Sequence, residues 1–261
     1  MKRALDSVNE KIFAAVKRRS SDIVAPCGLP RLIAVSKLKP ISSIVEAYQC
    51  GQRYFGENYI QELETKSNSE EILSQCSEIK FHFIGHLQSN KVNKLLKVKN
   101  LHMIETVDSK KLADLIDKAI DRHKVDGEEP LSFIDDKQQH CDQLNVLIQV
   151  NTSGEEQKNG VEPNEVIPLA EHILSQCKWL RLAGLMTIGK LDGWNEPGPN
   201  KDFLKLYEVR DLLSRHMSID QSSLELSMGM SSDFEEAIEL GSTNVRVGTM
   251  IFGERPPKRS E

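Results

Sequence analysis

The sequence has little of what marks disulfide-rich, membrane-spanning or nucleic-acid-binding proteins. Its five cysteines are odd in number, scattered and without a CxxC pair, so the spacing supports neither a disulfide framework nor a metal site. No apolar run is long enough to cross a bilayer. The formal net charge of −5 argues against a general nucleic-acid or anionic-membrane surface. We expect reduced thiols in a reducing compartment, with neither nucleic acid nor membrane as a partner.

Glycine and proline are also few, and a composition of 39% hydrophobic and 28% charged residues is typical of globular proteins. Residues 1–20 are basic and amphipathic and lack the apolar stretch of a secretory signal. A mitochondrial presequence is the alternative, but Asp6 and Glu10 interrupt the segment and presequences are poor in acids. We therefore expect a surface helix over 1–20 and a cytoplasmic protein.

Short apolar, β-branched runs alternate with segments of helical spacing along the whole chain. The predicted strands are 31–38, 53–56, 80–85, 101–107, 145–151, 180–188, 224–229 and 245–253. The predicted helices between them are 40–50, 58–75, 89–97, 109–123, 162–177, 200–217 and 232–240. Eight alternations favour an α/β fold with a parallel sheet closed into a (β/α)8 TIM barrel. The rival, an open doubly wound sheet, usually has fewer strands and a Gly-rich first turn.

We expect one domain over 1–261, with two interruptions to this alternation. Residues 126–143 are acidic, polar and too long for a helix–strand turn, which predicts a surface insertion dispensable for folding. The stretch 193–200 is interpreted in the same way. Residues 254–261 form a short basic tail without a predicted function.

Lys37 is the first candidate functional residue. If Ile33 and Val35 face the barrel interior, strand alternation turns Lys37 inward as well, at the carboxyl end where barrel sites gather. Burial lowers the pKa of an amine, and a neutral amine can attack an aldehyde. The alternative is that Lys37 reaches out of the barrel mouth or pairs with a carboxylate.

The last two predicted strands end in residues suited to an anion. Ser227 and Gly229 end one of them, and Arg246, Gly248 and Thr249 follow in the other. Free backbone N–H groups, hydroxyls and a guanidinium bind phosphate in this part of the fold. The alternative is that the small residues make tight turns and Arg246 pairs with an acid. Taken with Lys37, they indicate a ligand with an aldehyde and a phosphate, a description that fits pyridoxal phosphate.

Other polar side chains follow the remaining strands. Glu57 and Asn58 could cap a helix or contact a ligand, and we expect Asn58 to face the mouth. His82 and His86 have no third ligand near them in sequence, so we expect no metal site there.

Several ordered motifs resemble the pyridoxal phosphate homeostasis protein family, also called the proline-synthase co-transcribed family. They are AVSKLKP (34–40), FGENYIQE (55–62), HFIGHLQSNK (82–91), VDSKKL (107–112), VNTSGEEQKNG (150–160), GLMTIG (184–189) and LSMGMSSDFEEAIELGSTNVRVGTMIFG (226–253). The resemblance covers about residues 30–253, and so many ordered motifs make it specific. The insertion at 126–143 is the main departure from the family pattern.

The resemblance implies a barrel like the N-terminal domain of alanine racemase, a fold-type III barrel, with pyridoxal 5′-phosphate on Lys37 as an internal aldimine. It implies phosphate contacts from Ser227, Arg246, Gly248 and Thr249. Asn58 and Met228 match motif positions near the cofactor, and Lys158 is a secondary attachment point in this interpretation.

The resemblance also implies a non-enzymatic role in cofactor storage and supply, with apo-enzymes dependent on pyridoxal phosphate as partners. The alternative is a fold-type III amino-acid racemase or decarboxylase. Such enzymes carry a second domain, for which the sequence after the last predicted strand leaves no room, and racemisation needs a base on each face of the adduct. A barrel for another phosphorylated aldehyde is the third hypothesis.

Overall fold

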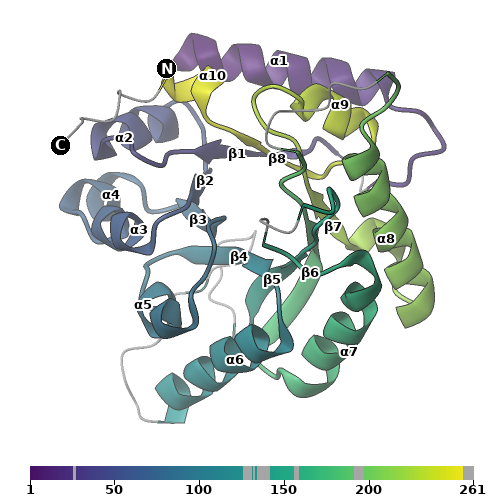
Figure 1. Cartoon of the computed structure of the whole chain (residues 1–261). Helices are drawn as coiled ribbons and strands as arrows, with labels where there is room; N and C mark the ends of the chain where they lie inside the picture. The colour runs from purple at the N-terminus through teal and green to yellow at the C-terminus, as the bar shows by residue number, and fades with distance from the viewer. Residues whose placement is uncertain are drawn as a thin grey trace.

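The computed structural model is a closed barrel of parallel strands in the order β1-β2-β3-β4-β5-β6-β7-β8, surrounded by helices (Figure 1). The structure describes residues 1–25, 28–125, 131, 133, 142–155, 159–190 and 197–254. The strands are β1 (Arg31–Val35), β2 (Tyr54–Glu57), β3 (Lys80–Phe83), β4 (Leu101–Val107), β5 (Leu144–Gln149), β6 (Leu180–Met186), β7 (Glu225–Ser227) and β8 (Asn244–Val247). The predicted (β/α)8 barrel is confirmed.

The helices cover the outer face of the barrel. They are α1 (Lys2–Arg18), α2 (Ile41–Gln49), α3 (Ile60–Ser67), α4 (Glu70–Gln75), α5 (Val92–Leu96), α6 (Lys110–Val125), α7 (Val166–Gln176), α8 (Lys201–Met217), α9 (Phe234–Glu239) and α10 (Thr249–Phe252). Single 3-10 turns occur as η1 (Ser89–Lys91), η2 (Pro163–Glu165) and η3 (Gln221–Ser223). Among the described residues, no helix combines the length and apolarity that a membrane span needs.

Strand alternation directs side chains either outward, to a core shared with the helices, or inward, to the barrel interior. Leu32 and Ala34 belong to the large hydrophobic cluster shared with the helices, which leaves Ile33 and Val35 on the interior face. A Cβ on Gly56 would lie 3.0 Å from the side chain of Ile33, so β1 and β2 face each other closely inside the barrel. A second, small cluster of Met103, Leu147, Ala183 and Met186 fills part of this interior.

α1 lies where the sequence predicts an N-terminal helix, and it packs on α9 and α10 (Figure 1). It buries Leu5, Val8, Ile12 and Ala15, which recur at the spacing of one helical face. Arg18 at its end donates to Glu235 and Glu239 of α9. The helix therefore covers the outer side of the seam at which β8 meets β1.

Several boundaries differ from the prediction, and the strand predicted over 31–38 ends at Val35. The helix predicted over 58–75 is divided into α3 and α4, because Asn68 ends the first and the Ser69 hydroxyl accepts from the Ile72 N–H to begin the second. The strand predicted over 245–253 ends at Val247, and α10 follows. The residues of α10 are as apolar as those of a strand, and periodicity over so few residues does not distinguish a helix from a strand.

The insertion 126–143 is not wholly a surface segment. Most of it lies outside the described residues, but Phe133 is 1% exposed and forms a parallel bridge with Leu101 at the start of β4. Leu131 packs against the same core. The expectation that the whole segment is dispensable is corrected on this point, because the average polarity of the segment concealed one large apolar side chain that the core accepts.

We predict that Phe133→Ala will lower the free energy of unfolding by about 3–5 kcal/mol, the usual cost of emptying a buried phenylalanine site. The matched control is Phe13→Ala on α1, where the ring is 51% exposed and the change should stay within about 0.5 kcal/mol. Urea unfolding followed by circular dichroism measures both. Equal, small losses would mean that Phe133 does not belong to the core.

Candidate functional site

Lys37 lies just beyond the carboxyl end of β1, in a turn that carries the chain from the barrel to α2. It is half-buried. The strand predicted over 31–38 ends at Val35, so strand alternation does not set the direction of the Lys37 side chain. The next residue, Leu38, is exposed and has a φ of 60°, a left-handed conformation that costs a non-glycine residue about 1–2 kcal/mol. The chain therefore adopts an unfavourable turn immediately after this lysine, and its neighbours must hold it.

A cluster of three charged side chains holds the turn from the outside, and we call it the Lys66 clamp: Glu57, Glu62 and Lys66. Lys66 Nζ donates to the Ser36 carbonyl at 2.7 Å and to one oxygen of each carboxylate at 2.6 Å. Those oxygens also accept from the turn itself, Glu57 from the Ser36 hydroxyl and Glu62 from the Leu38 N–H, both at 2.6 Å. The backbone on either side of Lys37 is thus fixed.

The clamp is buried, which makes each of its contacts matter. Lys66 is 4% and Glu57 0% exposed. Burial raises the pKa of Glu57, and the opposing effects of Lys66 and of the Ser36 hydroxyl do not cancel it. Charges removed from water in this way are tolerated only when paired. Glu57 therefore supports the turn through Oε1, while its Oε2 is buried and has no hydrogen-bond partner among the described residues.

Asn58 follows Glu57 just beyond the end of β2. Its Oδ1 is buried and makes no hydrogen bond within the described structure. A Cβ on Gly85 would lie 2.0 Å from the Asn58 carbonyl oxygen, so only glycine lets the β3 loop approach this closely. A buried amide oxygen without a partner is costly, and a ligand donor at the mouth would satisfy it.

Arg246 of β8 sits inside the barrel, 5% exposed, and heads a chain of hydrogen bonds across it. Its Nη1 donates to Ser227 Oγ at 2.7 Å, and its Nη2 donates to the Thr187 carbonyl at 2.8 Å. Ser227 in turn donates to Glu105 Oε2 at 2.5 Å. The other Glu105 oxygen lies 2.6 Å from His82 Nδ1. We call these residues the barrel chain: His82, Glu105, Ser227 and Arg246.

The barrel chain sets the charge of the interior. Full burial would raise the pKa of Glu105, but the hydrogen bond and charge of His82, the charge of Arg246 and the hydrogen bond from Ser227 together hold it below its usual value. Burial also lowers the pKa of Arg246, yet a guanidinium keeps its proton in proteins. The interior thus holds an ionised carboxylate and an arginine that are joined through one hydroxyl.

The loops after β7 and β8 meet beside Arg246. Its own N–H donates to the Gly229 carbonyl at 3.0 Å, and the Gly248 N–H donates to Ser231 Oγ at 3.3 Å. Gly229 has a φ of 94°, and a Cβ there would lie 2.6 Å from that of Ala237, so the loop needs glycine. Thr249 is exposed at the first turn of α10. These groups form an anion-accepting rim.

Two predicted residues have other surroundings, and one is not described. The Met228 side chain is fully buried in the cluster shared with the helices, since Ser227 already takes the inward direction. The Met228 N–H donates to the Asn244 carbonyl, and the Met228 carbonyl accepts from the Ser242 hydroxyl. The Ser227 hydroxyl is engaged with Glu105 rather than directed at the rim. Lys158 lies outside the described residues.

Sequence reasoning missed Glu105, Lys66 and Glu62. A lone carboxylate inside the apolar run LHMIETV was a usable signal for Glu105, because a buried charge needs a partner. Glu62 and Lys66 are four residues apart on a predicted helix, where such a pair is usually an exposed ion pair, so no sequence signal distinguished them.

The arrangement can hold a ligand with two different ends. A lysine on a fixed turn offers an amine at the β1 side of the mouth. Arg246 offers positive charge beside the rim at the β7 and β8 side. The two sides are adjacent, since β1 pairs with β8 with Ile33 opposite Arg246. A small molecule carrying an aldehyde and an anion fits both.

Comparison with known proteins agrees with this geometry. The family described as alanine racemase, N-terminal domain, matches residues 13–256. The human pyridoxal phosphate homeostasis protein is 49% identical over 252 residues, which are 97% of this chain and 86% of that protein. Its counterpart in Caenorhabditis elegans is 40% identical, over 98% of this chain and 99% of that protein.

Solved structures give the same result. PipY of Synechococcus elongatus, solved with PLP bound, has a TM-score of 0.69 at 30% identity and covers 94% of this chain and 99% of its own. An alanine racemase of Clostridium difficile shares the fold at 14% identity, with a TM-score of 0.58 over 98% of this chain and 59% of its own. The chain belongs to the pyridoxal phosphate homeostasis protein family, built on the barrel of the alanine racemase N-terminal domain.

Proposed function

We propose that this chain binds pyridoxal 5′-phosphate at the carboxyl end of the barrel and serves to store and supply it. Lys37 provides the amine to which the aldehyde attaches. Arg246, Gly248 and Thr249 hold the phosphate, with the Ser231 hydroxyl beside them, and the Ser227 hydroxyl holds the Arg246 guanidinium in place. Asn58 contacts the ring side, and Met228 lies next to it in the wall of the site.

One observation carries the proposal: the amine on its clamped turn and the buried guanidinium lie on hydrogen-bonded neighbours, β1 and β8. Because the two strands are rigid, the separation between the Lys37 amine and the Arg246 guanidinium is fixed. A ligand can match this separation with the distance between its reactive carbon and its anionic group. The names of the relatives, and the PLP in the structure of PipY, support this choice over another phosphorylated aldehyde.

When bound, the cofactor supplies an aldehyde that exchanges reversibly between amines. The residues of this chain supply the positioning. The Lys66 clamp keeps the turn around Lys37 in place, and the barrel chain keeps Arg246 from leaving the interior. Because both sets are anchored in the barrel wall, little ordering remains to be done when the ligand binds.

Storage fits the described residues better than turnover. A racemase or decarboxylase needs a base at the α-carbon, and the buried His82 does not reach the mouth. His82 is hydrogen-bonded to Glu105 and packs against Tyr54 and His102, with ring centroids 5.8 and 5.1 Å away. Tyr54 begins β2 and His102 lies at the start of β4, so this imidazole faces the amino end of the barrel.

We further propose that the receivers are apo-enzymes that depend on pyridoxal phosphate, and that exchange occurs in the cytoplasm. Cys50, Cys76 and Cys177 are free thiols, which a reducing compartment maintains. Transfer then needs only an acceptor lysine and a water molecule at an open barrel mouth.

We predict that Lys37→Ala will abolish the cofactor adduct that borohydride fixes on the peptide around residue 37, because the amine is removed while the barrel wall is untouched. Peptide mass spectrometry of the reduced protein measures it. Lys39→Ala is the matched control, since Lys39 Nζ donates to the Phe252 and Gly253 carbonyls instead. An adduct found on another lysine in the parent protein, with none on Lys37, would contradict the assignment.

Arg246→Ala should weaken pyridoxal phosphate binding by about 1.5–3 kcal/mol, the value of a hydrogen bond to a charged group. Binding of pyridoxal without the phosphate should change far less. Arg31→Ala is the control, because Arg31 pairs with Glu225 at the amino end of the barrel. Equal losses for the two ligands would place the phosphate elsewhere.

The supply function predicts one positive and one negative result. Loaded protein should restore an apo-enzyme that depends on pyridoxal phosphate, and the Lys37→Ala variant should not. Incubation of the loaded protein with common amino acids in D2O should give no α-deuteration above background by mass spectrometry. Lys37-dependent deuterium exchange with many turnovers per chain would instead establish the racemase or decarboxylase alternative.

A further inference from the structure

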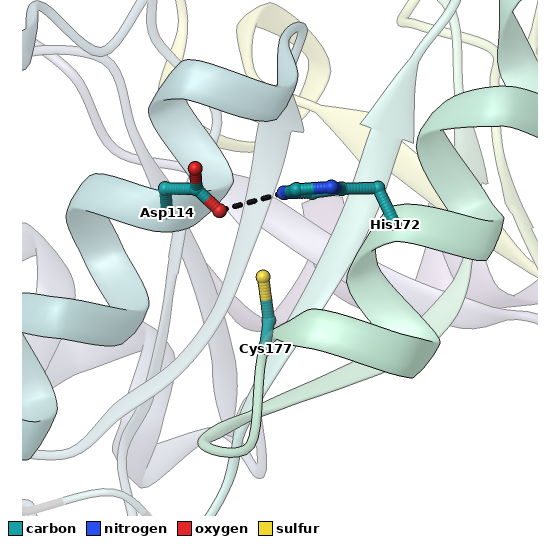
Figure 2. Close-up of side chains that lie close together, drawn as sticks. All are labelled: Asp114, His172 and Cys177. Carbon is teal, nitrogen blue, oxygen red and sulfur yellow. Dashed lines mark hydrogen bonds and ion pairs between the residues drawn. The ribbon is translucent and has the colours of Figure 1, made fainter.

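A second cluster of reactive side chains lies on the outside of the barrel, where α6 and α7 pack side by side (Figure 1). It consists of Asp114 on α6, His172 on α7 and Cys177 at the end of α7. Figure 2 shows the Cys177 sulfur directed at the gap between the carboxylate and the imidazole. One ligand atom from each residue lies within 4.8 Å of the other two. The proposed cofactor site has no part in this cluster.

We propose that Asp114, His172 and Cys177 form a binding site for Zn2+ or a similar thiophilic divalent cation. The set offers one thiolate, one imidazole nitrogen and one carboxylate oxygen. Zinc accepts all three donor types in tetrahedral sites, whereas Mg2+ and Ca2+ favour oxygen alone. A water molecule would complete the fourth position.

The distances need only side-chain rotation. Zinc–ligand bonds of about 2.0–2.3 Å place neighbouring ligand atoms of a tetrahedron about 3.5 Å apart. His172 Nε2 and Asp114 Oδ1 are now 2.6 Å apart, as a hydrogen bond, and would separate by about 1 Å. The sulfur would approach by a similar amount.

Hydrogen bonds from both α6 and α7 hold the segment that carries Cys177. The Cys177 N–H donates to the Ile173 carbonyl at 3.1 Å and caps α7. Two residues later, the Trp179 N–H donates to Asp117 of α6 at 2.6 Å, and its indole N–H donates to Asp121 at 2.8 Å. The segment that carries Cys177 is therefore anchored to α7 on one side and to α6 on the other.

The charges favour a cation. Burial, then the carboxylates of Asp117 and Asp114, raise the pKa of the Cys177 thiol to about 11, against a smaller opposing effect of Lys118. A thiol of that kind is a poor nucleophile, which argues against a reactive cysteine. Metal binding displaces the thiol proton to solvent. The thiolate and the Asp114 carboxylate then neutralise the 2+ charge, which suits a partly buried site.

The exposure of the three side chains would let an ion enter while the sulfur stays buried. Cys177 is 5% exposed, while the Asp114 and His172 side chains are 37% and 20% exposed. An ion can enter along the α6 side, and the sulfur remains protected from oxidants. The segment after Cys177 leads into the amino end of β6, the end opposite the proposed cofactor site, so the metal would act on stability.

The test uses the full chain, freed of metal with a chelator and titrated with CoCl2. Cobalt should bind once per chain and give a thiolate-to-cobalt charge-transfer band, which ZnCl2 should remove and MgCl2 should not. Cys177→Ser should abolish the band. His172→Ala and Asp114→Asn should each weaken zinc binding at least about 10-fold, since even indirect supports of a metal ligand contribute that much.

Cys50→Ser and His216→Ala are matched controls, since Cys50 ends α2 and His216 pairs with Glu171 instead; both should keep the band. If Cys177→Ser fails to fold by circular dichroism, the two substitutions at partly exposed ligands decide the outcome. Absence of cobalt uptake, an undiminished band in Cys177→Ser, or equal competition by magnesium would each overturn the proposal.

Discussion

The pairing of β1 with β8 is the constraint on which the rest of the molecule depends. It closes the sheet by setting Arg31 through Ala34 against Asn244 through Val247. Closure removes the two open sheet edges. It also brings the first strand, which leads into the turn with Lys37, beside the last strand, which carries Arg246. Without it, the two groups that define the proposed cofactor site would lie at opposite sides of an open sheet.

Closure forces polar groups into the interior, and the barrel chain shows how they are tolerated. Glu105 and Arg246 are almost completely buried, at a desolvation cost of several kcal/mol for each ion. Ser227 links them, and His82 and the Thr187 carbonyl satisfy the outer ends. Such a chain is unfavourable if any member is lost, so it holds the Arg246 guanidinium in one orientation. That rigidity is useful to a protein that must hold a ligand reversibly.

The two faces of the barrel have different tasks. At the carboxyl end, a left-handed residue at Leu38 and an amide oxygen at Asn58 without a hydrogen-bond partner remain in the folded chain. Such costs collect where a ligand binds. Toward the amino end, the Asp114, His172 and Cys177 cluster and the Arg31 ion pair with Glu225 join neighbouring elements. Substitutions toward the amino end should therefore affect stability, and substitutions at the carboxyl end should affect ligand binding.

The sequence by itself determined the architecture, because the two periodicities that distinguish strands from helices depend only on neighbours along the chain. It also singled out Lys37 and Arg246, since strand parity and residue chemistry are local. The Lys66 clamp, the link from Ser227 to Glu105 and the burial of Phe133 were decided by the tertiary structure alone. So was the meeting of Asp114, His172 and Cys177, whose spacing shows no metal motif. Each joins residues from different elements, and which side chains meet there depends on barrel closure and helix packing, which no local pattern encodes.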